Sequence, residues 1–272
     1  MALSGTLYPP LKDGEIRILI IHPSQRGDTI PCDLISCPLK TGSNMPYAAL
    51  SYTWGSTNPS KNIRVNGYEV HIRQNLWLAL GALRDETDRR TIRADAICIN
   101  QSEILERNRQ VSRMCDIYRS ASCIAIWLGE ACDDSDLVFD YLGTSQASRL
   151  LRIAMGSEGL PGEREDSPVC LSKRFKKALL ALCERPYWRR VWIIQGVLAA
   201  SRLTVLCGLR SVALTNVLLA QDTRLYGEIS SESRSPLCAT LAWSIICLRG
   251  TLAHQDGYSL SQLILTCSDC GS

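Results

Sequence analysis

Short strand-like segments alternate with helical ones along most of this chain, and that alternation limits the possible folds more than any other feature. Apolar, β-rich runs occur at "EIRILII" (15–21), "YAALSYTWG" (47–55), "SCIAIWLG" (122–129) and "RLTVLCG" (202–208). Strands that alternate with helices at such intervals are typical of a parallel sheet covered by helices. We therefore predict an α/β fold whose central sheet is mainly parallel and flanked by helices.

Several helices can be placed from the spacing of apolar residues. Leu76, Leu80 and Leu83 share one face of a helix over 74–86. The stretch 102–118, "SEILERNRQVSRMCDIY", predicts a second helix with Ser102 as its N-cap. Its buried face is expected to carry Ile104, Val111, Met114 and Tyr118. Further helices are expected up to Leu142 and on both sides of Pro186, and "IRVNGYEVHI" (63–72) predicts a hairpin around Asn66-Gly67.

Composition narrows the class of protein. Of the 272 residues, 46% are hydrophobic and the formal net charge is only +3, which is too small to argue for nucleic acid or an anionic membrane as a partner. The longest apolar run, Leu237 to Leu248, is shorter than the ~20 residues that a bilayer requires, so no membrane span is expected. The N-terminus lacks the pattern of a secretory signal, and the 13 cysteines are therefore expected as free thiols in the cytoplasm.

Familiar cofactor and metal motifs are missing from the sequence. It has no GxGxxG, GxxxxGK[ST], HExxH or GxSxG pattern, and its 3 histidines are widely separated. The single CxxC, Cys267 with Cys270, has no second pair at zinc-finger spacing. We therefore predict neither a metal site nor a bound cofactor.

Polar and aromatic residues follow two of the predicted strands. In an open parallel sheet, ligands bind beyond the carboxyl ends of the strands. Two of the candidate ligand-binding residues also have a purely structural interpretation. Asp95 can be an acid whose carboxylate is hydrogen-bonded by nearby backbone amides, and Trp54 can be a packing residue. Taken singly, none of these residues identifies a function. The candidates at the end of the strand over 47–55 are Ser51, Tyr52, Trp54 and Gly55. A further β-rich run, "TIRADAICINQ" (91–101), leads into a polar loop and supplies Asp95, Asn100 and Gln101.

Four blocks in a fixed order identify the chain more specifically. They are "YAALSYTWG", "DAICINQ", "ERNRQVSRMCDIYRSASCIAIWLG" and "RPYWRRVWIIQ". This succession resembles the heterokaryon incompatibility (HET) domain of filamentous fungi. On this basis we expect a lead-in over 1–45, a HET domain over 46–208 with an inserted loop near 156–170, and a mostly helical extension over 209–272. The extension contains "YSLSQLILTC", which resembles the start of a longer family segment, so the chain is interpreted as a truncated or shortened member.

The resemblance implies both a role and a chemistry. The role is nonself recognition and regulated cell death in fungi, a form of innate immunity, with other HET or Toll/interleukin-1 receptor (TIR)-like domains or further copies of the chain as partners. The fold implied is TIR-like, with a flavodoxin-like core and helical additions. TIR enzymes cleave NAD with a glutamate on a helix that corresponds to "WRRVWIIQ". NAD is thus the substrate implied, and Trp192 and Gln195 join the candidate substrate-binding residues.

Two positions depart from the family pattern. The family reads Gln-Glu where this chain reads Gln195-Gly196, so Gly196 occupies the place of the catalytic carboxylate. Losing a comparable electrostatic stabiliser costs ~10²–10³ in rate. Arg93 stands before Ala94-Asp95, where the family has an aromatic or aliphatic residue. A buried arginine there needs a carboxylate partner or a route to water.

Three hypotheses follow, and they leave open whether the chain is an enzyme. The first is a HET-domain protein with a TIR-like scaffold that cleaves NAD poorly and acts by domain association. The second is an active NAD glycohydrolase whose acid is another carboxylate, such as Asp95 or one from a partner subunit. The third is a non-functional remnant that folds poorly because of Arg93 and the early C-terminus.

Overall fold

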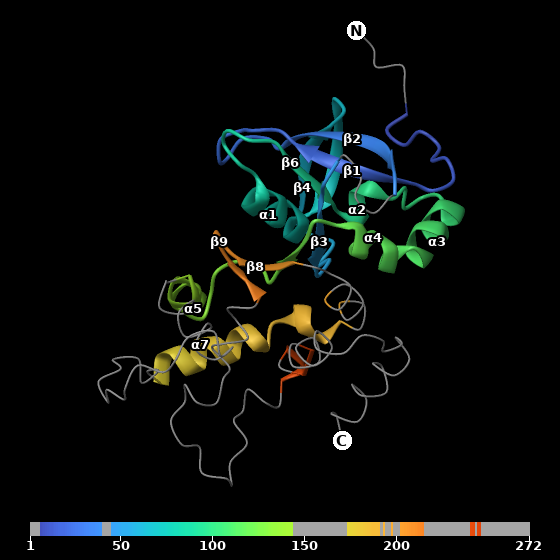
Figure 1. Ribbon diagram of the computed structural model, residues 1–272. Helices are drawn as coiled ribbons and strands as arrows, with labels where there is room; N and C mark the ends of the chain where they lie inside the picture. The colour runs from blue at the N-terminus through green and yellow to red at the C-terminus, as the bar shows by residue number, and fades with distance from the viewer. Residues whose placement is uncertain are drawn as a thin grey trace. The chain divides into compact units, whose positions relative to one another are not determined.

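A computed structural model describes residues 6–39, 45–143, 173–190, 193, 197, 202–214, 240–242 and 244–245. The chain divides into two compact units (Figure 1). The first comprises Met1–Gly129 with Leu198–Leu203, and the second comprises Glu130–Val197 with Thr204–Ser272. The boundaries expected at residues 45 and 208 remain a prediction.

The first unit is built on a mixed sheet. Its strands are β1 (Glu15–Ile21), β2 (Pro31–Pro38), β3 (Ala48–Tyr52), β4 (Ser60–Val65), β5 (Tyr68–Arg73), β6 (Arg90–Arg93) and β7 (Cys123–Trp127), in the spatial order β5-β4-β2-β1-β6-β3-β7. Parallel pairing joins β3 to both β6 and β7, and β2 to β4. The pairs β1–β2, β1–β6 and β4–β5 are antiparallel.

The prediction of a mainly parallel sheet was therefore wrong, because two hairpins and the pairing of β1 with β6 are antiparallel. β4 and β5 are joined at Asn66 and Gly67, which have positive φ angles of 50° and 83° and make a tight turn that forces antiparallel pairing. β2 lies in a stretch punctuated by Pro31 and Pro38, which carries no clear strand signal, and it folds back on β1. The predicted hairpin over 63–72 is confirmed.

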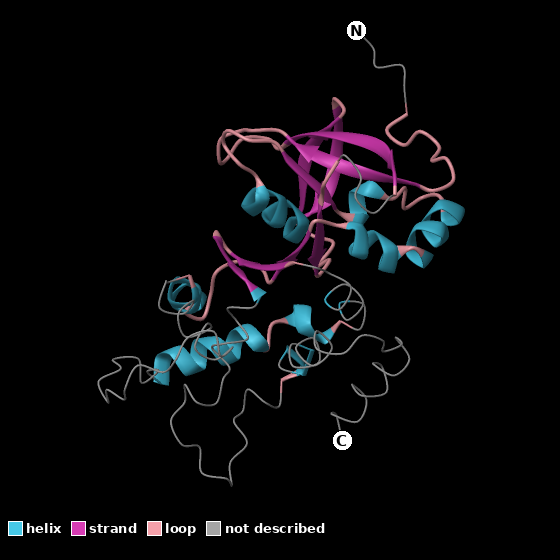
Figure 2. Cartoon of the chain, viewed as in Figure 1, coloured by secondary structure: helices cyan, strands magenta, loops and turns pink. Residues whose placement is uncertain are grey.

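Helices cover this sheet, as Figure 2 shows for the first unit. α1 (Gln74–Leu83) contacts β4 and β5, and it buries Leu76 and Leu80 as the spacing predicted. α2 (Asp95–Cys98) contacts β1 and begins immediately after β6. Asp95 therefore opens a one-turn helix, where the sequence predicted a β-rich run that leads into a loop.

The predicted helix over 102–118 is two helices. α3 (Ile104–Ser112) and α4 (Met114–Ser120) are separated at Arg113, whose φ and ψ of −100° and 6° interrupt the helical backbone. The expected cap was also wrong, because Glu103 is the N-cap and its carboxylate accepts a hydrogen bond from the Leu105 N–H.

The orientation of α3 also differs from the prediction. Ile104 and Val111, expected in the core, are 59% and 42% exposed. The buried residues of α3 are Glu106 and Gln110, which lie one turn apart on the opposite face. The inward face of α3 is therefore polar. On α4, Tyr118 is buried as expected.

The second unit contains α5 (Ser135–Leu142), α7 (Lys173–Cys183), a short 3-10 helix η1 (Pro186–Arg189), β8 (Leu203–Cys207) and β9 (Arg210–Ala213). All of β8 except Leu203 belongs to this unit. α5 contacts α7 and β9, and Arg210 on β9 forms ion pairs with Asp136 and Asp140 of α5. β9 is a strand in a stretch that was expected to be helical.

Some predicted features fall outside the described residues. They are the inserted loop near 156–170 and nearly all of the extension over 209–272. Within the part of the chain that the structure describes, no helix is long and apolar enough to cross a membrane.

Candidate functional site

A cavity of about 190 Å³ lies in the first unit, where the chain leaves β3. β5, α1, α2 and the loop after α2 contribute its other walls. The lining residues combine two aromatic rings and three aliphatic side chains with a histidine, an arginine and an amide. They are Tyr52, Trp54, His71, Ile72, Arg73, Leu76, Ala96 and Gln101.

Trp54 forms the most exposed aromatic wall, with 39% of its surface accessible. The guanidinium carbon of Arg73 lies 5.1 Å from the centre of the Trp54 ring, which is cation–π distance. The same guanidinium donates a hydrogen bond of 2.8 Å to the Gly55 carbonyl. Arg73 therefore holds the loop after β3 against β5 and places a positive charge beside the tryptophan.

Asn75, at the start of α1, fixes the same loop through its side chain. Its amide nitrogen donates to the Thr53 carbonyl and, at 3.2 Å, to the Thr53 hydroxyl oxygen. Its amide oxygen accepts a hydrogen bond of 2.9 Å from the Trp127 indole N–H. One amide thus connects β7, α1 and the loop that carries Trp54, so the loop is held in one conformation.

Gly55 lies within this loop with a φ of +71°, and a Cβ atom there would lie 3.2 Å from Asn75 Cβ. Gly55→Ala is therefore expected to destabilise the chain by about 1–2 kcal/mol, from the unfavourable φ and the contact. At Gly81, inside α1, an added Cβ would have no atom within 4 Å apart from the adjacent residues and the backbone of its own helix, so Gly81→Ala is expected to stabilise by about 0.5–1 kcal/mol. Urea denaturation measures both; equal effects of the two substitutions would contradict this explanation.

The cavity brings together three of the predicted residues, Tyr52, Trp54 and Gln101. Gly55 lies beside it through the hydrogen bond from Arg73. Ser51 is buried within β3 and does not line the cavity.

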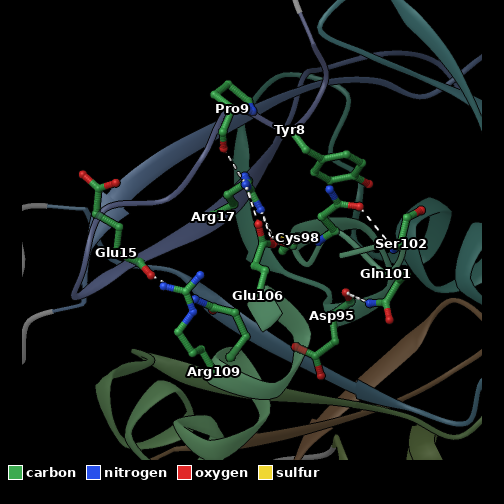
Figure 3. A network of polar contacts seen from close by, with 12 residues as sticks. Tyr8, Pro9, Glu15, Arg17, Asp95, Cys98, Gln101, Ser102, Glu106 and Arg109 are labelled. Atoms are coloured by element: carbon green, nitrogen blue, oxygen red, sulfur yellow. Dashed lines mark hydrogen bonds and ion pairs between the residues drawn. The ribbon is translucent and has the colours of Figure 1, made fainter. Parts of the chain in front are cut away.

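Asp95 and Asn100 do not line the cavity either. The backbone carbonyl of Asp95 accepts a hydrogen bond of 2.9 Å from the Gln101 amide, and its carboxylate lies 3.8 Å from Arg93 Nε (Figure 3). The Asn100 N–H donates to the Glu106 carboxylate at 2.8 Å, and the Asn100 side-chain oxygen accepts from the Ser102 N–H. Both residues order the loop that presents Gln101.

Sequence reasoning missed His71 and Arg73 as lining residues. They are two positions apart on β5, so their side chains fall on one face of the strand. That spacing is visible in "YEVHIR", but nothing in the sequence indicates that β5 lies next to the loop after β3.

A buried ion pair supports the loop after α2 (Figure 3). Arg17 is 1% exposed and donates two hydrogen bonds, of 2.6 and 3.0 Å, to the Glu106 carboxylate. It also donates to the carbonyl oxygens of Pro9 and Cys98, and the Tyr8 ring lies 5.2 Å from its guanidinium carbon. Burial acts to raise the pKa of Glu106, but hydrogen bonds from Arg17 and the Asn100 N–H outweigh it and hold that pKa below its usual value.

Arg93 is the second buried arginine, also 1% exposed. It donates to the Arg17 carbonyl at 2.7 Å and to the Gln110 side-chain oxygen at 3.1 Å, and the Asp95 carboxylate lies 3.8 Å away. Gln110 in turn donates to the Glu15 carbonyl. The buried Arg93 therefore has the carboxylate neighbour that was expected, in Asp95. Its hydrogen bonds also connect β6 to β1 and α3.

The chemistry available in the cavity follows from its lining. Among the described residues no aspartate or glutamate lines it, whereas Arg73 carries a positive charge. The aromatic and aliphatic walls can hold a planar ring, and the arginine and the Gln101 amide can bind polar substituents. Burial raises the pKa of the nearby Cys98 thiol to about 11, so this cysteine is not a ready nucleophile.

Several predicted positions lie outside the described residues. They are the helix residues Trp192, Gln195 and Gly196, and the pair Cys267 and Cys270. In the part of the chain that is described, no group of three His, Cys, Asp or Glu side chains is arranged to hold a metal ion.

The fold and cavity define an α/β domain with a small aromatic pocket at the end of a parallel strand. Comparison with known families identifies the domain more specifically. The family described as heterokaryon incompatibility protein (HET) matches residues 47–196. The match covers more than half of the chain and begins just before β3. The chain belongs to the HET family.

A similarity to one curated protein extends beyond that region. The chain is 28% identical over 240 residues to heterokaryon incompatibility protein 6, OR allele, of Neurospora crassa, a match that covers 76% of this chain. The chain spans 35% of the length of that protein. No solved structure matches the chain.

Proposed function

We propose that the chain acts in fungal nonself recognition and regulated cell death, a form of innate immunity, as a TIR-like HET domain. Its NAD-cleaving scaffold is catalytically impaired, and it works by association with other HET or TIR-like domains or with its own copies in the cytoplasm. The observation that carries this proposal is the family match over 47–196, which contains the whole cavity and ends at Gly196.

Several features support the individual parts. The name of the Neurospora protein supports the role in heterokaryon incompatibility. In support of a TIR-like core, β3 has parallel neighbours on both sides, and the cavity lies where that strand ends. Ligands of open α/β sheets bind at such a position.

Impaired cleavage follows from the distribution of carboxylates. Departure of nicotinamide leaves an oxocarbenium-like ribose that a fixed carboxylate stabilises. Residue 196 is glycine, and no described carboxylate lines the cavity. The alternative acid, Asp95, does not line the cavity, and its carboxylate lies 3.8 Å from Nε of the buried Arg93.

The purified chain is expected to release no nicotinamide from NAD above a buffer blank, and to unfold cooperatively on heating. Chromatographic detection of nicotinamide and a thermal melt measure the two properties. If the chain releases nicotinamide steadily and Asp95→Ala abolishes this, the chain is an active glycohydrolase and the impaired-scaffold proposal is wrong. A melt without a cooperative transition would support the poorly folded remnant.

Association is tested separately by analytical ultracentrifugation of the chain alone and mixed with a second, catalytically intact HET domain. The proposal expects a complex in at least one of these samples at micromolar concentration. Monomers in both samples would contradict the association half of the proposal, whatever the NAD assay shows.

A further inference from the structure

The outward face of α3 carries an unusual share of exposed apolar surface. Of the eight large hydrophobic side chains exposed among the described residues, three lie on this nine-residue helix. Ile104 is 59% exposed, Leu105 68% and Val111 42%. The helix directs Glu106 and Gln110 inward to the buried arginines, so its aliphatic residues necessarily face outward.

Arginines flank the outward face of α3. At 3.6 residues per turn, Ile104 and Val111 adjoin each other on the outward arc, and Leu105 lies further round it. The exposed polar residues Asn108 and Ser112 lie between them, with Arg107 at one edge of the arc and Arg109 at the other. Both arginines are exposed, and the half-buried Arg113 follows at the end of the helix.

These charges are not compensated by ion pairs within the described residues. No ion pair there involves Arg107, Arg109 or Arg113, and the one hydrogen bond that Arg109 donates goes to the Leu105 carbonyl. The nearby acid Asp116 is engaged by Arg119. The whole-chain charge of +3 averages over this local cluster and therefore conceals it.

We propose that α3 docks the chain on an anionic lipid surface. Interfacial helices place aliphatic side chains at the boundary of headgroups and acyl chains, while flanking arginines contact the headgroup phosphates. α3 lies at the periphery of the first unit (Figure 1), and neither of the two cavities described in that unit contains an α3 residue. An exposed strip outside these cavities suits a flat lipid surface better than a peptide, which normally occupies a groove.

A second copy of the chain is a poorer occupant. A symmetric dimer through this face would place the arginines of one copy against those of the other, and the one exposed acid of the helix, its N-cap Glu103, cannot compensate all of them. The inference requires neither NAD binding nor cleavage, so it can fail or succeed independently of the proposed function.

Flotation of the full chain with vesicles tests the proposal. The chain is expected to float with phosphatidylcholine vesicles that contain about 30% phosphatidylserine, to remain unbound with phosphatidylcholine alone, and to dissociate as salt rises. Ile104→Ser combined with Leu105→Ser is expected to abolish flotation. Arg107→Gln and Arg109→Gln are each expected to weaken partitioning about fivefold.

Matched controls come from elsewhere on the surface. Leu209, 65% exposed on the turn between β8 and β9, and Arg89, exposed before β6, are expected to tolerate Leu209→Ser and Arg89→Gln without loss of flotation. Failure of the full chain to float with anionic vesicles would overturn the proposal, as would α3 variants that float like the controls. If the α3 substitutions instead dissolve a complex seen by ultracentrifugation, α3 is a protein interface and not a lipid one.

Discussion

Gly196→Glu is expected to raise the rate of nicotinamide release by about 10²–10³-fold over the parent chain. The prediction rests on the proposed function. A glycine has no side chain, so no rearrangement of rotamers can supply a negative charge at residue 196. A glutamate there restores a carboxylate that can hold the ribose hydroxyls and stabilise the positive charge that develops as nicotinamide leaves.

The matched control is Gly196→Gln, which has nearly the same shape and helix propensity without the charge. Both variants are also expected to be slightly more stable than the parent if residue 196 is helical, because glycine costs about 1 kcal/mol inside a helix. Nicotinamide release is measured for all three proteins at matched concentration, with circular dichroism to establish that each is folded. If the glutamate variant is folded but as inactive as the glutamine variant, the chain lacks an NAD-cleaving scaffold.

The strands were predictable where their signals are local. Apolar, β-rich runs in the sequence coincide with β1, β3, β7 and β8. The Asn66-Gly67 turn fixes a hairpin between adjacent segments of the chain. The pairing of distant strands has no such signal. β2 could not be anticipated from a stretch punctuated by proline and cysteine, and its antiparallel pairing with β1 was missed with it.

The orientation of α3 shows a second limit. An apolar stripe at helical spacing ordinarily faces the core. Here the inward face is polar because Glu106 meets Arg17, which is 89 residues earlier in the chain, and Gln110 meets Arg93. Such compensation between buried polar groups is visible only in three dimensions. The same holds for Arg73, which reaches the loop of Trp54 through the fold of the β4–β5 hairpin.

Glu106→Ala is expected to destabilise the chain by about 3–5 kcal/mol, because it leaves the guanidinium of Arg17, 1% exposed, buried without its carboxylate. The matched control is Glu103→Ala on the same helix, which removes only an exposed cap and is expected to cost about 0.5–2 kcal/mol. Urea denaturation monitored by tryptophan fluorescence measures both. Equal losses of stability would show that leaving Arg17 without its carboxylate costs no more than removing an exposed helix cap.

Two further measurements separate charge from packing. The pKa of Glu106 is lowered in the folded chain, so its stabilising contribution is present above the unfolded pKa of about 4.3 and is lost as pH falls below that value towards the folded pKa. Glu106→Gln should remove this part of the acid sensitivity.

Replacing both partners, Arg17→Met with Glu106→Leu, should lower the free energy of unfolding clearly less than Glu106→Ala alone, because no charge is then left buried and unpaired. A double variant less stable than the single one would mean that the contacts of Arg17 with Pro9, Cys98 and Tyr8 stabilise the fold, and that the single loss is not chiefly the desolvation of Arg17.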